Sequence, residues 1–208
     1  MLSAIVLAAG NSTRMGSPKA ILDVPSGLSF VGAIAHALAI AGVTDIVIVT
    51  GRDHDRVREA LARDAPPVAP RLVRNADPSR GQLSSLWAGM DAVVTPQTEA
   101  LLMTLVDVPL VAPVTIRRVI AEWARTRAPI VRPAIGDRHG HPVIFDRLLF
   151  DELRAAPLDA GAKVVVRAHE AAIVNVPVDD EGALIDVDTP AEYERLRGMP
   201  PGADRRPR

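Results

Sequence analysis

Short apolar runs alternate with longer segments of helical periodicity along almost the whole chain. The apolar runs are rich in branched residues, which is typical of strands buried on both faces of a sheet. They predict strands at residues 3–8, 45–50, 71–74, 100–106, 130–132, 142–145 and 173–176. Helical patterns lie between them at residues 30–42, 53–64, 84–94, 113–127, 148–155, 162–169 and 189–197. This alternation predicts an α/β fold, a Rossmann-like three-layer sandwich around a mostly parallel sheet.

The length of the chain fits one domain. Its 208 residues can bury one sizeable core, and no internal repeat is present. We expect a single domain over residues 1–198. Residues 199–208 are rich in proline, glycine and arginine, and we expect them to form a flexible C-terminal tail.

Composition narrows the class of protein. The formal net charge is −1, so the chain has no broad electrostatic attraction for nucleic acid or for a membrane surface. No apolar run reaches the length of a membrane span, and residues 1–15 lack the layout of a signal peptide. The absence of cysteine excludes disulfides and thiolate metal sites. We therefore expect a cytoplasmic protein with neither nucleic acid nor membrane as a partner.

An anion-binding loop follows the first predicted strand. Glycine lets a backbone approach a ligand closely, and successive N–H groups in such a turn bind anions. Two cationic side chains add positive charge. The loop contains Gly10, Asn11, Ser12, Thr13, Arg14, Gly16 and Lys19. Because it lies at the carboxyl end of a first strand, we expect it to bind a phosphorylated ligand.

The spacing of this loop differs from two common phosphate-binding motifs. Five residues separate Gly10 from Gly16, where the P-loop of NTPases has four, and Lys19 follows a proline. The dinucleotide fingerprint needs further glycines that residues 11–13 do not supply. It also needs an acidic residue at the end of the second strand, where residues 50–52 are Thr-Gly-Arg.

Two acidic positions are candidates for a metal site. Asp107 follows the strand at residues 100–106, so it shares a sheet edge with the first loop. Asp186 and Asp188 are two residues apart and point the same way in strand geometry. Carboxylates beside a phosphate loop are ligands expected for Mg²⁺. Each position has an alternative, since Asp107 can begin a turn before proline and Asp188 can cap the last helix.

Two polar segments are candidates for substrate contacts. Gly81, Gln82, Ser84 and Ser85 offer groups that suit a base edge and a ribose, although Ser84 or Ser85 can equally act as a helix cap. The loop at residues 136–141 is dense in hydrogen-bond donors. Its two histidines lack the further histidine or cysteine that a zinc site needs, so we favour contact with an anionic substrate.

Five segments together resemble a known family. LAAGNSTRMGSPKAIL, RGQLSSL, LVDVPL, GHPVIF and DVDTP occur in the order and approximate spacing of the molybdenum-cofactor nucleotidyltransferase group, over about residues 3–197. This group is similar to the sugar-phosphate and methylerythritol-phosphate nucleotidyltransferases. Ala9 in LAAG resembles the cytidylyltransferase type, because the guanylyltransferases usually have LAGG. The resemblance implies a fold of the nucleotidyltransferase type, CTP as the nucleotide and a molybdopterin-type acceptor.

The resemblance also implies roles for the residues at matching positions. Arg14, Lys19 and Asp107 would be catalytic, and Asp107 with Asp188 would hold Mg²⁺. Gly140 and His141 would lie toward the acceptor. The nucleotide-binding residues would be Leu7, Ala8, Ala9, Gly10, Asn11, Ser12, Thr13, Arg14, Lys19, Gly81, Gln82, Ser84 and Ser85.

The leading hypothesis is a Mg²⁺-dependent nucleotidyltransferase that moves CMP from CTP to the phosphate of molybdopterin and releases pyrophosphate. A phosphate nucleophile is already ionised, so cations and metal matter more than a general base. A molybdenum enzyme or its chaperone would be a protein partner. Two alternatives stay open: an oxidoreductase of the same family with a nicotinamide or flavin cofactor, and a non-catalytic cofactor-binding chaperone.

Overall fold

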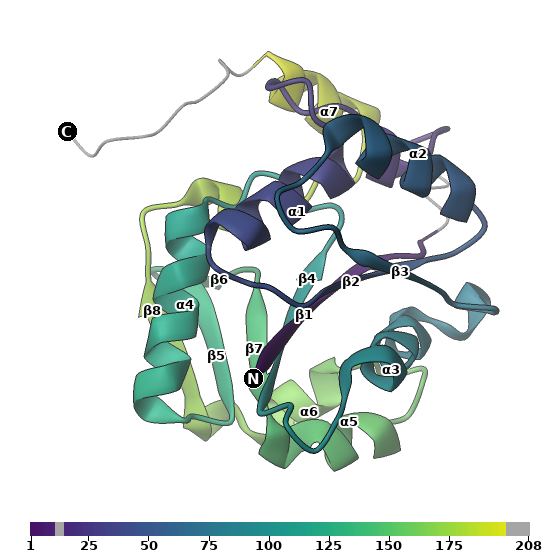
Figure 1. Ribbon diagram of the computed structural model, residues 1–208. Helices are drawn as coiled ribbons and strands as arrows, with labels where there is room; N and C mark the ends of the chain where they lie inside the picture. The colour runs from purple at the N-terminus through teal and green to yellow at the C-terminus, as the bar shows by residue number, and fades with distance from the viewer. Residues whose placement is uncertain (11–14, 199–208) are drawn as a thin grey trace.

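A mixed sheet of eight strands forms the centre of the computed structural model, which describes residues 1–10 and 15–198 (Figure 1). The strand order is β3-β2-β1-β4-β7-β5-β6, and β8 pairs with β5. The strands are β1 (Leu2–Ala8), β2 (Ile46–Thr50), β3 (Arg71–Arg74), β4 (Ala100–Leu105), β5 (Ile130–Ile135), β6 (Arg138–His139), β7 (Val143–Asp146) and β8 (Ile173–Pro177). The predicted α/β fold with a mostly parallel sheet is confirmed.

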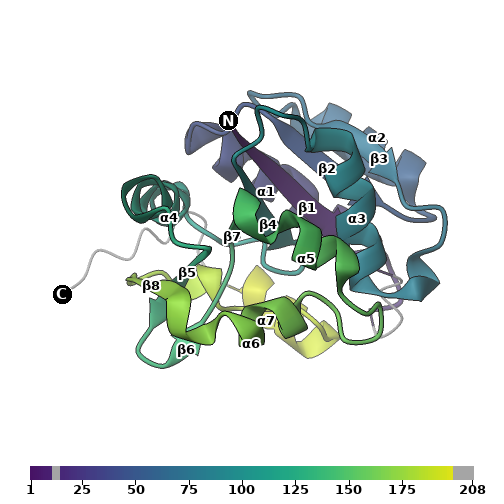
Figure 2. The same ribbon diagram turned by 90° about the horizontal axis from the view of Figure 1, so that it is seen from below.

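Helices cover both faces of this sheet. They are α1 (Phe30–Ile40), α2 (His54–Asp64), α3 (Gln82–Val93), α4 (Pro113–Thr126), α5 (Phe150–Ala155), α6 (Lys163–Ala168) and α7 (Pro190–Arg197). Figures 1 and 2 show α3, α5 and α6 together on one face, opposite α1 and α4. In the described part of the chain, no helix is long and apolar enough to cross a membrane.

Alternation along the central strand creates two cores. Ala4 and Val6 of β1 pack in a cluster with α1, α2 and α4, whereas Ile5 and Leu7 pack in a cluster with α3, α5 and α6. Successive side chains of a strand point to opposite faces, so a strand covered on both faces must be apolar throughout. This explains the continuous apolar run at residues 4–9.

Two strands, β6 and β7, run antiparallel to the others. β1 pairs in parallel with β2 and β4, β2 with β3, and β5 with β8, but β7 is antiparallel to both β4 and β5. The polar segment at residues 136–141 contains β6, which pairs with β5 as a hairpin and turns the chain back. Antiparallel strands can be joined by such a short turn, whereas parallel strands need a long crossover. The segment predicted as a loop is therefore what inserts β7 beside β4.

The start of α3 differs from the sequence prediction. The helix begins at Gln82, with Gly81 at its N-cap position, so neither Ser84 nor Ser85 is the cap residue. Gly81 has a φ of 96°, a conformation that side-chain-bearing residues rarely adopt. The sharp turn there, which only glycine makes cheaply, moved the helix start two residues toward the N-terminus.

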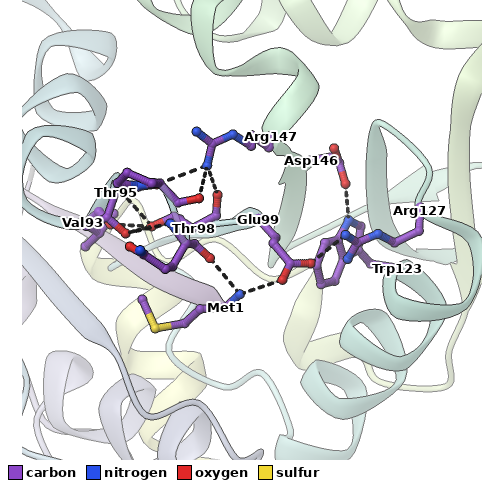
Figure 3. A network of polar contacts seen from close by, with 11 residues as sticks. Met1, Val93, Thr95, Thr98, Glu99, Trp123, Arg127, Asp146 and Arg147 are labelled. Carbon is purple, nitrogen blue, oxygen red and sulfur yellow. Dashed lines mark hydrogen bonds and ion pairs between the residues drawn. The ribbon is translucent and has the colours of Figure 1, made fainter.

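A network of polar contacts joins segments at the end of the sheet where β1 and β4 begin (Figure 3). Arg127 Nη2 donates to Glu99 Oε2 at 2.6 Å, and its guanidinium lies 4.5 Å from the ring centroid of Trp123. Trp123 Nε1 donates to Asp146 Oδ2 at 2.9 Å. These contacts tie α4 to β7 and to the start of β4, at the edge opposite the strand ends discussed below.

A buried aspartate joins α1 to α2. Asp64 Oδ2 accepts hydrogen bonds from the backbone N–H of Ser29 at 2.8 Å and from the Ser29 hydroxyl, while Oδ1 accepts one from Arg63 Nε at 2.8 Å. A Cβ on Gly32 would lie 2.0 Å from Asp64 Oδ2, so only glycine fits there. Burial alone would raise the pKa of Asp64, but the hydrogen bonds from Arg63 and Ser29 outweigh it and hold that pKa below its usual range.

Replacing Asp64 is expected to destabilise the fold in a pH-dependent way. At neutral pH, Asp64→Asn should lower the free energy of unfolding by about 2 kcal/mol, because buried donors lose their charged acceptor. A depressed folded-state pKa stabilises the fold above the unfolded pKa of about 3.9, and this contribution is lost as the pH falls through the folded-state pKa. Urea unfolding over a pH series should therefore show the two proteins converging in acid. Asp55→Asn, an exposed carboxylate on the same helix, is the control. A gap of constant size at all pH values would contradict this account.

Candidate active site

A cleft of about 260 Å³ opens at the carboxyl ends of β1, β2 and β4. Strand ends of one parallel group share a sheet edge, and this edge is where open α/β folds bind ligands. The lining residues are Leu7, Ala8, Ala9, Gly10, Pro18, Lys19, Ala20, Asp53, Val57, Pro78, Gly81, Gln82, Ser85, Leu105, Val106, Asp107 and Asp188. Most of the predicted site residues therefore surround one cavity. Asn11, Ser12, Thr13 and Arg14 lie outside the described residues, and their roles stay predictions.

Lys19 links the two predicted acidic positions. It begins a short 3₁₀ turn (Lys19–Ile21), and its side chain is 11% exposed. Its Nζ lies 3.5 Å from Asp107 Oδ2 and donates a hydrogen bond to Asp188 Oδ1. Three segments that are far apart in sequence thus place one ammonium group between two carboxylates. The structure brings Asp107 and Asp188 together, and their role as metal ligands stays a prediction.

Backbone hydrogen bonds hold the two acidic segments in register. Val187 N donates to Asp107 O at 2.8 Å, so the residue before Asp188 pairs with the end of the β4 segment. Thr189, not Asp188, is the N-cap of α7, and Thr189 and Glu192 form a reciprocal capping box. The alternative in which Asp188 caps the helix is therefore wrong, and its carboxylate faces Lys19 instead.

One carboxylate oxygen of this cluster can accept a cation. Asp107 Oδ1 is buried and has no hydrogen-bond partner among the described residues. Partial burial, and then the charges of Asp107 and Asp188, raise the pKa of the neighbouring Asp186, as expected where negative charge accumulates. A buried, unpartnered carboxylate oxygen beside a second carboxylate fits a hard divalent cation.

The described part of the chain holds no group of three or more His, Cys, Asp or Glu side chains arranged to ligate a metal. Two carboxylates are nevertheless the protein ligands that Mg²⁺ ordinarily uses when phosphate oxygens and water complete its shell. The donor set therefore fits a cation that binds together with a phosphorylated ligand better than one held by protein alone.

Backbone segments pack closely where Ala8, Ala9 and Pro78 line the cleft. A Cβ on Gly51 would lie 2.8 Å from Ala9 O and 3.2 Å from Pro78, so the ends of β1 and β2 and the segment before α3 touch. Ala8 and Ala9 present little side chain here, which leaves backbone groups to contact a ligand. Sequence reasoning missed Asp53, Val57 and Pro78 as cleft residues. The position of Asp53 just beyond β2, at the same sheet edge, was the signal that could have found it.

The two serines of α3 differ in position. Asn75 Nδ2 donates to Ser84 Oγ at 2.9 Å and to Ser85 Oγ at 3.0 Å. The Ser84 hydroxyl donates in turn to Gly81 O at 2.7 Å, and Ser84 does not line the cleft. Ser85 does line it. A nucleotide contact by Ser85 is consistent with this position, and a contact by Ser84 stays a prediction.

The expected acceptor-side residues lie beside the cleft rather than in its lining. His141 N donates to Ala183 O at 2.8 Å, and a Cβ on Gly140 would lie 2.1 Å from the same oxygen. Burial lowers the pKa of His141, which favours the neutral ring, and its Nδ1 has no partner among the described residues. The role of His141 toward the acceptor substrate stays a prediction.

The fold and the cleft define a nucleotidyltransferase-like α/β protein, with a glycine-bearing loop, a lysine and two carboxylates at one sheet edge. The family model described as "MobA-like NTP transferase domain" matches residues 4–173, and the chain belongs to this family. The resemblance seen in the sequence motifs is thereby confirmed at the level of the family.

Relatives of this chain have varied names. It is 30% identical over 202 residues to "Nicotine blue oxidoreductase" of Paenarthrobacter nicotinovorans, covering 94% of this chain and 96% of that one. It is 24% identical over 196 residues to "Molybdenum cofactor cytidylyltransferase" of Escherichia coli strain K12, covering 92% and 93%.

Solved structures agree on the fold. The crystal structure of Rv0371c from Mycobacterium tuberculosis H37Rv superposes with a TM-score of 0.77 at 30% identity, covering 95% of this chain and 98% of that one. A complex of Rv0371c with manganese gives 0.69 at 29% identity, covering 94% and 97%.

Proposed function

We propose that this protein is a divalent-metal-dependent nucleotidyltransferase that transfers CMP from CTP to the phosphate of molybdopterin or a closely related cofactor. The observation that carries the proposal is the cluster of Lys19, Asp107 and Asp188 at the cleft, with a buried Asp107 oxygen that no described donor reaches. The family supports a nucleoside triphosphate as substrate.

In the proposed reaction an oxygen of the acceptor phosphate attacks the α-phosphorus of the triphosphate in line. The bond from that phosphorus to the bridging oxygen breaks, and pyrophosphate leaves with the electron pair. Several negative charges must meet, so positive charge is the main requirement. Lys19 supplies one fixed charge, and the N–H groups near Gly10 can hold phosphate oxygens. The acceptor phosphate is already ionised, so no side chain needs to remove a proton.

The metal would be held by Asp107 and Asp188. When bound, a divalent cation would neutralise phosphate charge and orient the triphosphate. Manganese bound to the related Rv0371c supports divalent metal use, and we propose Mg²⁺ as the ion used by this protein. Lys19 would then move from pairing with the carboxylates to balancing the charge of the phosphates.

The choice of CTP rests on Ala9, which lines the cleft and resembles the residue of the cytidylyltransferase type at this position. The cytidylyltransferase relative from Escherichia coli supports the same nucleotide and a molybdopterin-type acceptor. A molybdenum enzyme or its chaperone would then receive the product.

A thermal-shift panel tests this proposal directly. CTP with Mn²⁺ or Mg²⁺ should raise the melting temperature more than GTP, ATP or UTP, because a ligand at 100 times its Kd stabilises the native state by about 2.7 kcal/mol. Pyrophosphate release with molybdopterin as acceptor should follow the same order. A clear preference for another nucleotide would overturn the assignment of CTP but leave the class of enzyme standing.

The second candidate is an oxidoreductase. Residues 50–52 lack the acid that a dinucleotide site needs after the second strand, but the relative named "Nicotine blue oxidoreductase" favours this candidate. NADH and NADPH therefore belong in the same panel, and stabilisation by either of them without any effect of nucleoside triphosphates would favour this candidate.

A further inference from the structure

The carboxylate of Asp180, in the connection between β8 and α7, makes several hydrogen bonds. This connection also contains Asp186 and Asp188. Asp180 Oδ2 accepts hydrogen bonds from Ala112 N at 2.8 Å and from Thr115 Oγ1 at 2.7 Å. Its Oδ1 accepts a hydrogen bond from Gly182 N at 3.0 Å. Both oxygens are used, so Asp180 closes its own turn and also ties the connection to the first turn of α4.

The distant carboxylate of Asp180 contacts the start of the helix α4. Ala112 occupies the N-cap position and makes no side-chain cap, and alanine is a poor N-cap residue. Asp180 lies 68 positions away in sequence and accepts hydrogen bonds from the N–H of Ala112 and from the hydroxyl of Thr115 in the first turn. Its negative charge also suits the positive end of the helix dipole. The helix start and the acid-bearing connection are therefore held together as one unit.

The turn that Asp180 caps contacts the segment after β4 and the residue expected on the acceptor side. Gly182 packs so closely that a Cβ would lie 2.2 Å from Leu110 O, in the segment that follows β4. Ala183 O accepts the hydrogen bond from His141 N, on the expected acceptor side. A displacement of this turn would therefore also displace the backbone at Leu110 and at His141.

The same connection then reaches the acidic pair. Val187 N donates to Asp107 O at 2.8 Å, and Asp188 follows at once with its bond to Lys19. Asp180 anchors the start of this stretch and Val187 its end, one position before Asp188. No contact joins Asp180 itself to Lys19 or to Asp107 among the hydrogen bonds of the described residues, so any effect it has on them passes through the backbone.

We propose that Asp180 is a positioning residue that holds Asp188 against Asp107 and thereby sets the affinity of the site for a divalent cation. The inference rests on the proposed function, because it takes Asp107 and Asp188 as the cation's ligands. Residues that orient metal ligands typically change metal affinity or activity 10- to 100-fold when they are replaced.

The test is a titration with Mn²⁺ alone, followed by electron paramagnetic resonance of the free ion. Asp180→Asn should raise the dissociation constant for Mn²⁺ by about 10- to 100-fold. Asp179→Asn is the matched control, since it makes the same change of charge at the adjacent, exposed position. Asp146→Asn is the control for stability, because the amide keeps only one acceptor oxygen for the two donors, Trp123 Nε1 and Leu148 N, at the opposite sheet edge. It should lower the melting temperature and leave Mn²⁺ binding unchanged.

Equal Mn²⁺ affinities for the wild type and Asp180→Asn would overturn the role of Asp180. So would an equal weakening in Asp146→Asn, because it would show that general destabilisation is the cause. If Asp180→Asn does not fold, Thr115→Val removes one of the bonds to Asp180 and should weaken Mn²⁺ binding in the same direction; unchanged binding would overturn the role. A wild-type protein that binds no Mn²⁺ would instead overturn the cation site of the proposed function itself.

Discussion

Lys19→Met is expected to lower nucleotidyl transfer by about a thousandfold, the upper range for removal of one group that stabilises transition-state charge. The ammonium is nearly buried between two carboxylates at the cleft, so no neighbouring solvent cation can take its place easily. Lys19→Arg should also lose most activity, because a planar guanidinium does not reproduce a compact point charge in a closed site. The measurement is pyrophosphate release with CTP and the acceptor.

The same variant should affect metal binding in the opposite direction. In the structure Lys19 occupies the carboxylates that would hold the cation, so it competes with the cation when no nucleotide is bound. Lys19→Met should therefore bind Mn²⁺ more tightly than the wild type while transferring more slowly. Lys163→Met, at the chain's other lysine, is the control for loss of a lysine and should change neither quantity. Weaker Mn²⁺ binding in Lys19→Met would contradict the idea that Lys19 and the cation share these ligands.

Asp107→Asn is expected to lower both transfer and Mn²⁺ binding, with a loss of transfer of about a thousandfold if the metal supplies several kcal/mol of charge stabilisation. Asp107→Asn should leave the free energy of unfolding nearly unchanged or raise it. A buried charged oxygen without a partner is costly, and the amide removes that charge. Circular dichroism melting should thus show no loss of stability beside the loss of function.

Asp55→Asn provides the control for this second variant. Asp55 is an exposed aspartate paired with Arg58 on α2, and its replacement should leave transfer and Mn²⁺ affinity at wild-type values. A fully active Asp107→Asn protein would remove Asp107 from the site. Comparing Asp107→Asn with Lys19→Met distinguishes a residue that binds the cation from one that competes with it.

Much of the fold could be predicted from local patterns. The strand after Met1, the helices around residues 53–64 and 113–127, and the strand before Asp107 all agree with the structure within one or two residues. Other features were decided by neighbours in space. The hairpin at β6 reversed β7, and a glycine with positive φ moved the start of α3. Neither event leaves a periodic signal in the sequence.

The sequence by itself determined the alternation of strands and helices, the glycine-bearing loop after β1 with Lys19 in it, and the place of Asp107 at a strand end. These follow from side-chain periodicity and backbone freedom, which act over a few residues. Only the tertiary structure decided that Asp188 pairs with Lys19 and that Thr189 takes the cap of α7.

The same holds for the long-range contacts that assemble the cleft. Lys19 meets Asp188 across 169 positions and Asp107 across 88, and Asp180 reaches Ala112 across 68. Such contacts depend on the order of the strands in the sheet and on where the long connections between strands and helices lie in the folded chain. Local propensity carries no information about either, because the free energy that selects them comes from packing and hydrogen bonds between segments distant in the chain.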